Sequence, residues 1–129
     1  MSRTGTFHLT SLGCAKNSVD SEAMAQLLME DGYTQVTDLQ KADILIVNTC
    51  GFIEAARRES YSVLGELARQ KQPGQLLIAA GCLTQRYGQE VSRQVPGVDG
   101  ILGTRRWMDI AMLVKQISRQ PDSRPLFDL

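Results

Sequence analysis

The sequence predicts an α/β fold, a flavodoxin-like open sheet of about five mainly parallel strands with helices on both faces. Three short strand-like segments end at Cys14, Cys50 and Cys82, and each is followed at once by a segment with helical periodicity. Such alternation is typical of a parallel sheet with right-handed crossovers. Two of the three segments are unbroken apolar runs, which is the pattern of strands that helices cover on both faces.

Five segments have the composition of strands. The first is apolar and β-branched and stops at a glycine, and the second is short and weak. The third and fourth, DILIVNTC and QLLIAAGC, hold the unbroken apolar runs, and the fifth follows a Pro-Gly turn. In chain order these strands are predicted over residues 7–12, 33–36, 43–50, 75–82 and 98–102.

Four segments repeat apolar residues at helical spacing. Asn17 and Ser18 are candidate caps of the first helix, Gly32 is placed to end it, and Thr84 is a candidate N-cap of the third. The sequence DLQKA predicts a short helical turn or loop, and Trp107 in the last helix is expected in the core. The helices are predicted over residues 18–31, from after Cys50 to about 70, 84–94, and from 104 onward.

Composition fits one globular domain. With 129 residues and 43% hydrophobic content, the chain can bury a core without disulfides, and we predict a domain over 1–119 followed by a linker over 120–129, where two prolines interrupt periodicity. Fourteen basic residues balance fourteen acidic ones, so no overall field indicates nucleic acid or a membrane surface. The absence of a long apolar run predicts no membrane span and a cytoplasmic location.

The three cysteines are expected to meet. In the strand order 2-1-3-4-5, the first, third and fourth strands are neighbours, and ligands bind at the carboxyl edge of such sheets. Cys14, Cys50 and Cys82 would converge at that edge, whereas an odd cysteine count excludes a fully paired disulfide framework.

Three thiolates suit an iron–sulfur cluster or zinc. Zinc is the weaker option, because a closed zinc site needs four ligands and the single histidine, His8, lies inside the first strand. A cubane cluster on three thiolates keeps one iron open, and the helix N-termini that follow the cysteines would favour its negative charge. Asn17, Asn48 and Thr49 are candidate hydrogen-bond donors to the cluster, although the last two could equally just end a strand.

The segments SLGCAKNSVDSE, VNTCGFIEAARRES and AAGCLTQRY resemble the three cysteine segments of the methylthiotransferases, a group within the radical S-adenosylmethionine enzymes. The resemblance covers nearly the whole chain in order. It implies that Cys14, Cys50 and Cys82 ligate an auxiliary 4Fe-4S cluster with one open iron.

Within that family, the substrate is either an aspartate of the twelfth protein of the small ribosomal subunit or a tRNA adenosine. Ala15 and Lys16 after the first cysteine, and Gly51 after the second, resemble the ribosomal-protein enzymes. The resemblance then implies transfer of a methylthio group to the β-carbon of the aspartate.

The resemblance also implies a second 4Fe-4S cluster, which cleaves S-adenosylmethionine and is held by a CxxxCxxC motif in a later domain. This chain has no cysteine left to supply that motif, so we expect a fragment whose partners are its own radical-SAM and C-terminal substrate-binding domains. No catalytic residue beyond the cluster ligands is expected here, and the fragment alone is not expected to be competent.

Two other classes stay open at this point. One is a cluster-free docking module whose thiols are incidental. The other is a thiol redox protein, which would need two cysteines within disulfide reach, with Cα atoms about 4.4 to 6.8 Å apart.

Overall fold

The computed structural model describes residues 5–12, 15–51, 54–119 and 125–129. In this part of the chain, six strands form one sheet in the order β2-β1-β3-β4-β5-β6, and all neighbouring strands are parallel. The predicted open sheet and its order are confirmed, with a sixth strand added at one end. The strands are β1 (Thr6–Ser11), β2 (Thr34–Gln35), β3 (Ile44–Thr49), β4 (Leu76–Gly81), β5 (Gly100–Gly103) and β6 (Leu126–Asp128).

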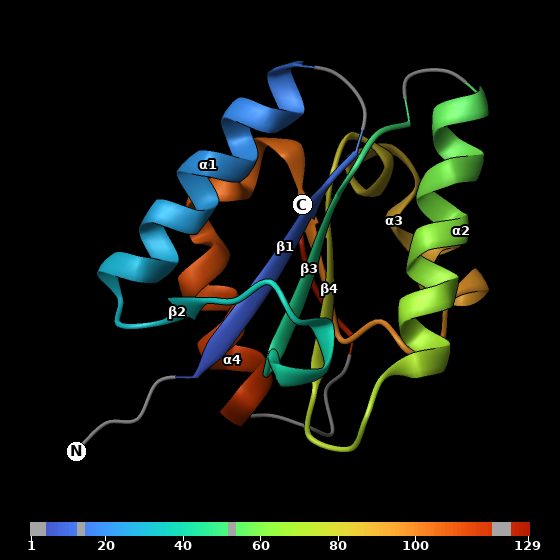
Figure 1. Cartoon of the computed structure of the whole chain (residues 1–129). Coiled ribbons are helices and arrows are strands. Elements are labelled where there is room, and N and C mark those ends of the chain that lie inside the picture. Colours follow the sequence, from blue (N-terminus) through green and yellow to red (C-terminus); the bar gives the residue numbers. More distant parts are fainter. Residues whose placement is uncertain (1–4, 13–14, 52–53, 120–124) are drawn as a thin grey trace.

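Helices cover both faces of the sheet, which gives three layers (Figure 1). On one face, α1 and α4 pack against β1, β3, β4 and β5, and on the other face α2 and α3 pack against the central strands. The described helices are α1 (Ala15–Glu30), α2 (Glu54–Gln70), α3 (Cys82–Gln94), α4 (Ile110–Arg119) and the 3-10 helices η1 (Leu39–Lys41) and η2 (Thr104–Asp109).

The central strands are the most deeply buried. Every residue of β3 and β4 is buried, as the unbroken apolar runs predict. Alternate side chains point to opposite faces, so Ile44 and Ile46 join the core under α1 and α4, whereas Leu45 and Val47 join the core under α2 and α3. Trp107 is half-buried and packs against the first of these two cores.

Two predicted helix caps are wrong. The helix α1 begins at Ala15, so Asn17 and Ser18 lie within it, and α3 begins at Cys82, so Thr84 lies within its first turn. The Oγ1 atom of Thr84 donates to the carbonyl oxygens of Gly81, at 2.9 Å, and Leu102, at 2.7 Å. The hydroxyl therefore ties the helix to the ends of β4 and β5 instead of capping it.

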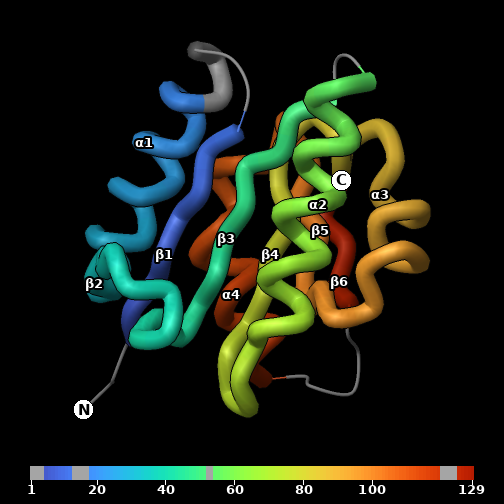
Figure 2. Tube along the Cα trace, turned by 45° about the vertical axis from the view of Figure 1, so that its right-hand side comes forward, coloured from blue at the N-terminus to red at the C-terminus, as the bar shows by residue number. Residues whose placement is uncertain are grey.

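The C-terminal part differs from the prediction in two ways. The segment that begins at Thr104 is a 3-10 helix with a kink at Arg106, and the α-helix starts only at Ile110. Leu126–Asp128, inside the expected linker, pair with β5 in parallel, and Figure 2 shows β5 and β6 continuing the sheet beyond β4. The division into a domain over 1–119 and a linker over 120–129 stays a prediction.

Across residues 5–12, 15–51, 54–119 and 125–129, no helix has both the length and the apolarity that crossing a membrane requires.

Candidate functional site

Cys50 and Cys82 lie next to each other at the carboxyl edge of the sheet. The register of β3 and β4 places Thr49 opposite Gly81, and the cysteines are the next residues in the sequence, with Cys82 already the first residue of α3. Neighbouring strands are about 4.8 Å apart. The strand order thus brings together the two cysteines that the structure describes, and both are free thiols.

The backbone at Cys50 is fixed by Ser60, a buried serine of α2. Its Oγ atom accepts a hydrogen bond from the amide of Cys50 and donates one to the carbonyl of the same residue, both at 3.0 Å. Ser60 is fully buried and Cys50 is 7% exposed. One side chain therefore satisfies both polar groups of the cysteine's backbone and attaches the end of β3 to α2.

Two glycines allow the backbone at the end of β3 and the backbone at the end of β4 to approach each other closely beside the cysteines. A Cβ atom on Gly51 would lie 2.9 Å from Cα of Leu83, the residue after Cys82. Gly81, just before that cysteine, has a φ of +101°, and a Cβ there would collide with the backbone of Thr49. The sequences TCG and AGC place small residues where the two strand ends approach each other.

The neighbouring polar side chains hold the strand ends together. Asn48 Nδ2 donates to Ser21 Oγ of α1 at 3.0 Å, and Thr49 Oγ1 donates to the carbonyl of Ala80 in β4 at 2.5 Å. All of these contacts are buried. The structure therefore gives Asn48 and Thr49 a role at the ends of the strands, and hydrogen bonding to a cluster stays a prediction for both.

The electrostatics of this edge favour an anion. The helix α3 begins at Cys82 itself, and α2 begins four residues after Cys50, so both helices direct their N-termini to this edge. The free amide groups of a helix N-terminus carry partial positive charge and stabilise negative groups. Thiolate sulfurs, and a cluster that carries net negative charge with them, suit this field.

The third predicted ligand lies outside the described residues, as does the side chain of Asn17, so both roles stay predictions. The pairing of β1 with β3 continues to Leu12, whose amide donates to the carbonyl of Asn48 at 3.0 Å. Cys14 follows two residues later in the sequence. Among the described residues no group of three or more His, Cys, Asp or Glu side chains is arranged to hold a metal. Two free neighbouring thiols fit part of a three-thiolate site.

His8 is excluded from this edge by its position. It lies in the middle of β1, and its Nδ1 atom is 3.0 Å from the carbonyl oxygen of Val36. The expectation that it packs within the sheet is confirmed.

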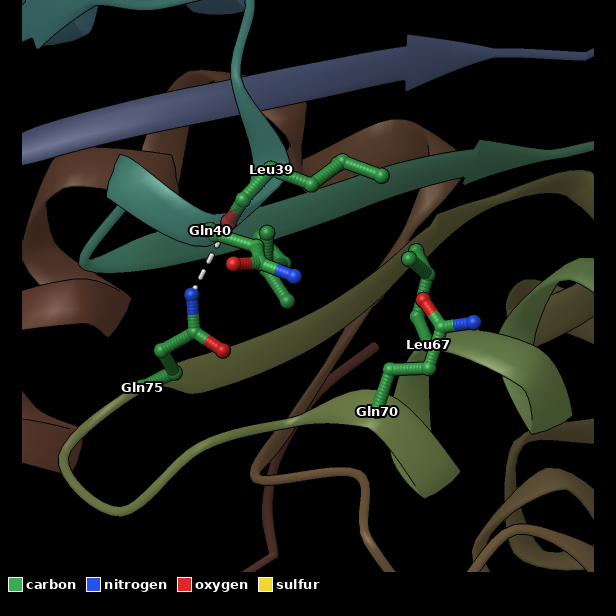
Figure 3. Close-up of a pocket in the computed structure, with 6 residues that line it drawn as sticks. Leu39, Gln40, Leu67, Gln70 and Gln75 are labelled. Atoms are coloured by element: carbon green, nitrogen blue, oxygen red, sulfur yellow. Dashed lines mark hydrogen bonds between the residues drawn. The ribbon is translucent and has the colours of Figure 1, made fainter.

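A hollow of about 400 Å³ opens at the opposite, amino edge of the sheet. Leucine and glutamine side chains surround it, and Figure 3 shows Gln75 reaching toward Leu39 across it. Gln75 Nε2 donates to the carbonyls of Leu39 and Ala42, and its Oε1 accepts from the amide of Gln72. The side chain that reaches across the hollow therefore already has its partners within the protein.

Ser60 and Ser21 are the site residues that sequence reasoning missed, and Thr84 was assigned a different role. Ser60 occupies a position in the apolar stripe of α2, and a serine in such a stripe indicates a buried hydroxyl that needs a partner. That signal was present in the sequence, but the identity of the partner was not.

Comparison with known proteins identifies the family. The description of the family whose pattern matches residues 6–103 is "Uncharacterized protein family UPF0004". The match contains Cys14, Cys50 and Cys82 and all strands except β6.

Several relatives share the name ribosomal protein uS12 methylthiotransferase RimO. The protein of Chloroflexus aurantiacus is 52% identical over 113 residues, which is 88% of this chain and 25% of the relative. The proteins of Roseiflexus sp. and Clostridioides difficile are 48% and 45% identical over 89% and 85% of this chain, and 24% and 25% of their own length. The resemblance to methylthiotransferases is confirmed, and the chain spans about a quarter of the length of these relatives.

Proposed function

The chain belongs to the protein family UPF0004, and from this membership we propose that it is the auxiliary-cluster domain of a uS12 methylthiotransferase. In this proposal Cys14, Cys50 and Cys82 ligate one 4Fe-4S cluster. The observation that carries the proposal is the register of β3 and β4, which makes Cys50 and Cys82 neighbours at the edge where α2 and α3 begin.

The chain's own residues contribute position and charge. Ser60 fixes the backbone of Cys50, and Thr84 fixes the start of α3 just after Cys82. The N-termini of α2 and α3 would favour the negative charge of a cluster bound at this edge. When bound by three thiolates, such a cluster supplies one iron without a protein ligand, at which a sulfur atom can bind.

The substrate follows from the relatives, which are named for uS12. We propose that the complete protein adds a methylthio group to the β-carbon of an aspartate of this ribosomal protein. S-adenosylmethionine and a second 4Fe-4S cluster would be held by other parts of the protein, which we take to be cytoplasmic. The tRNA-modifying alternative has no support among these relatives.

Anaerobic reconstitution with iron and sulfide tests the ligand set. About four irons per chain are expected. The variants Cys14→Ala, Cys50→Ala and Cys82→Ala are each expected to lose the cluster, because two thiolates do not hold a cubane firmly.

His8→Ala is the matched control. It removes the only histidine, which hydrogen-bonds within the sheet, so its iron content should equal that of the unmodified chain. Full iron content in a variant that lacks all three cysteines would contradict the proposal. A chain that binds no iron at all would favour a docking module instead.

A further inference from the structure

The strand β1 is paired along its whole length on one side but only along half of it on the other. On the β3 side, pairing runs from Phe7 to Ser11. On the β2 side it covers only Thr6 and Phe7, because β2 is two residues long. Figure 1 shows β2 flanking only one half of β1.

The direction of the backbone groups shows which residues of β1 are open. The carbonyl of Thr6 faces β3 and accepts a hydrogen bond from the amide of Asp43. The carbonyl of Phe7 faces β2 and accepts one from the amide of Val36. Because these directions alternate along a strand, Leu9 and Ser11 also point to the β2 side. Within the described part of the chain, their backbone groups have no partner there.

His8 explains why the pairing stops. In a parallel ladder that continued beyond Val36, the carbonyl of Val36 would be the next acceptor for the backbone of β1. That carbonyl is instead 3.0 Å from Nδ1 of His8, which donates to it. The histidine therefore ends β2 and leaves the amide of Leu9 available.

A groove of about 320 Å³ runs along this open edge. The helix α1 forms its wall, and Ser21 is anchored there by its hydrogen bond to Asn48. Met29, which is 43% exposed, adds an adaptable apolar surface. The lining residues are Leu9, Ser11, Ser21, Glu22, Ala25, Gln26, Met29 and Gln35.

We propose that an extended segment of the protein substrate binds in this groove and adds a strand to β1 at Leu9 and Ser11. Unpaired backbone groups at a strand edge are a template for such strand addition, in which main-chain hydrogen bonds give affinity and side-chain pockets give specificity. This inference rests on the proposed function, because it takes uS12 as the source of the segment.

Charge separates a polypeptide from a nucleic acid as the occupant. Among the described residues that line the groove, Glu22 carries the charge, and the other polar residues are serines and glutamines. Phosphate groups are bound by lysine and arginine side chains, and neither is among the described residues of the lining. A neutral or basic polypeptide segment would lie beside the carboxylate of Glu22, and its backbone could form hydrogen bonds with the open edge of β1.

The position of the groove also suits the proposed function. Ser11 is the last residue of β1, and Cys14 follows three residues later in the sequence. A strand added to β1 runs toward or away from the carboxyl edge, where Cys50 and Cys82 lie. In either direction, pairing at Leu9 and Ser11 would bring one end of the segment to the carboxyl edge, where the cysteines lie.

Amide hydrogen exchange measured by NMR tests the pairing. The ¹⁵N-labelled, reconstituted chain is mixed with recombinant bacterial uS12, and in a separate sample with unmodified tRNA. We expect uS12 to slow exchange at Leu9 and Ser11 and tRNA to leave these amides unchanged. Protection by tRNA, or binding of uS12 without protection of Leu9 and Ser11, would overturn the proposal.

Two variants test the backbone hydrogen bond at Leu9 and the charge of the groove separately. Leu9→Pro removes an amide that points away from β3, and it should weaken uS12 binding about fivefold, as expected for one backbone hydrogen bond. Gln26→Arg places a positive charge four residues from Glu22, where it would pair with that carboxylate, and should weaken uS12 binding roughly threefold. Circular dichroism confirms that each variant is folded.

Gln94→Arg is the matched control for the charge. Gln26 and Gln94 are both exposed helix residues that donate to a glutamate four residues away, but Gln94 lies in α3 on the opposite face. Its binding should equal that of the unmodified chain, and equal weakening by both arginine variants would overturn the proposal. The iron content of the same samples is measured separately, so a chain that holds four irons yet shows no protection refutes the edge pairing alone.

Discussion

At the amino edge of the sheet the buried polar groups bind one another, whereas at the carboxyl edge two thiols stay free. Lys71 Nζ lies 2.7 Å from Oδ2 of Asp99, and this carboxylate also accepts from the amide of Leu77. The glutamine that crosses the amino-edge hollow is likewise paired. Cys50 and Cys82 instead lie beside helix N-termini, and their surroundings are fixed by other side chains.

This difference shows that the size of a hollow is a poor guide to the site. The hollow at the amino edge, about 400 Å³, is larger than the groove beside β1, about 320 Å³. The side chains of Gln75 and Gln70, however, already have hydrogen-bond partners within the protein. We therefore expect variants at the amino edge to change stability and variants at the carboxyl edge to change iron binding as well.

The largest loss of stability is expected from Gly81→Ala, at the carboxyl edge. A methyl group there collides with the backbone of Thr49, and the φ of +101° is unfavourable for alanine. The expected cost is about 4 kcal/mol in the free energy of unfolding. Gly74→Ala is the control, because its φ is +91° but nothing lies within 4 Å, and it should cost about 1 kcal/mol. Equal costs in urea unfolding would show that the close approach is unimportant.

Asp99→Ala should cost about 3 kcal/mol, because it leaves the amide of Leu77 and the ammonium of Lys71 without their carboxylate. Iron bound per folded chain should not change. Glu66→Ala removes an exposed ion pair to Arg69 and should cost at most about 0.5 kcal/mol. Loss of iron from the folded Asp99 variant would contradict the expectation that the amino edge affects stability alone.

Ser60→Ala should cost about 2 kcal/mol, because the amide and carbonyl of Cys50 both lose a partner. It should also release iron faster to a chelator than the unmodified chain. Ser118→Ala, which removes a bond to Val114 within α4, is the comparison and should leave iron release unchanged. Identical release rates in the two variants would exclude a role for Ser60 in positioning Cys50.

The smallest effect is expected at β6. Burial, together with a hydrogen bond and repulsion from Asp109, raises the pKa of Asp128. The folded state therefore holds this proton more tightly than the unfolded state, and the resulting stability is lost as pH rises through the raised pKa. Asp128→Asn should remove this loss and stabilise the chain by less than about 1 kcal/mol at neutral pH. Thermal unfolding between acidic and neutral pH, with the exposed Glu59→Gln as control, measures it.

Much of the carboxyl edge could be predicted because its signals are local. The apolar runs that end at Cys50 and Cys82 identify two neighbouring strands, and the strand order then places both cysteines together. The cap predicted at Thr84 was wrong because its hydroxyl also bonds the carbonyl of Leu102, eighteen residues away, inside a helix that begins two residues earlier. The strand β6 was missed because Leu126–Asp128 become a strand only by pairing with β5. Contacts between distant segments have no local signature, so the sequence alone did not reveal them.

The central claim is that Cys14, Cys50 and Cys82 hold one cluster at the carboxyl edge. An anomalous difference map at the iron absorption edge, from crystals of the reconstituted chain, tests it most directly. We expect one compact peak beside Cys50 and Cys82, within bonding distance of Cys14 Sγ, and no peak in the hollow beside Gln75. Iron at the amino edge, or iron bound without one of the three sulfurs, would contradict it.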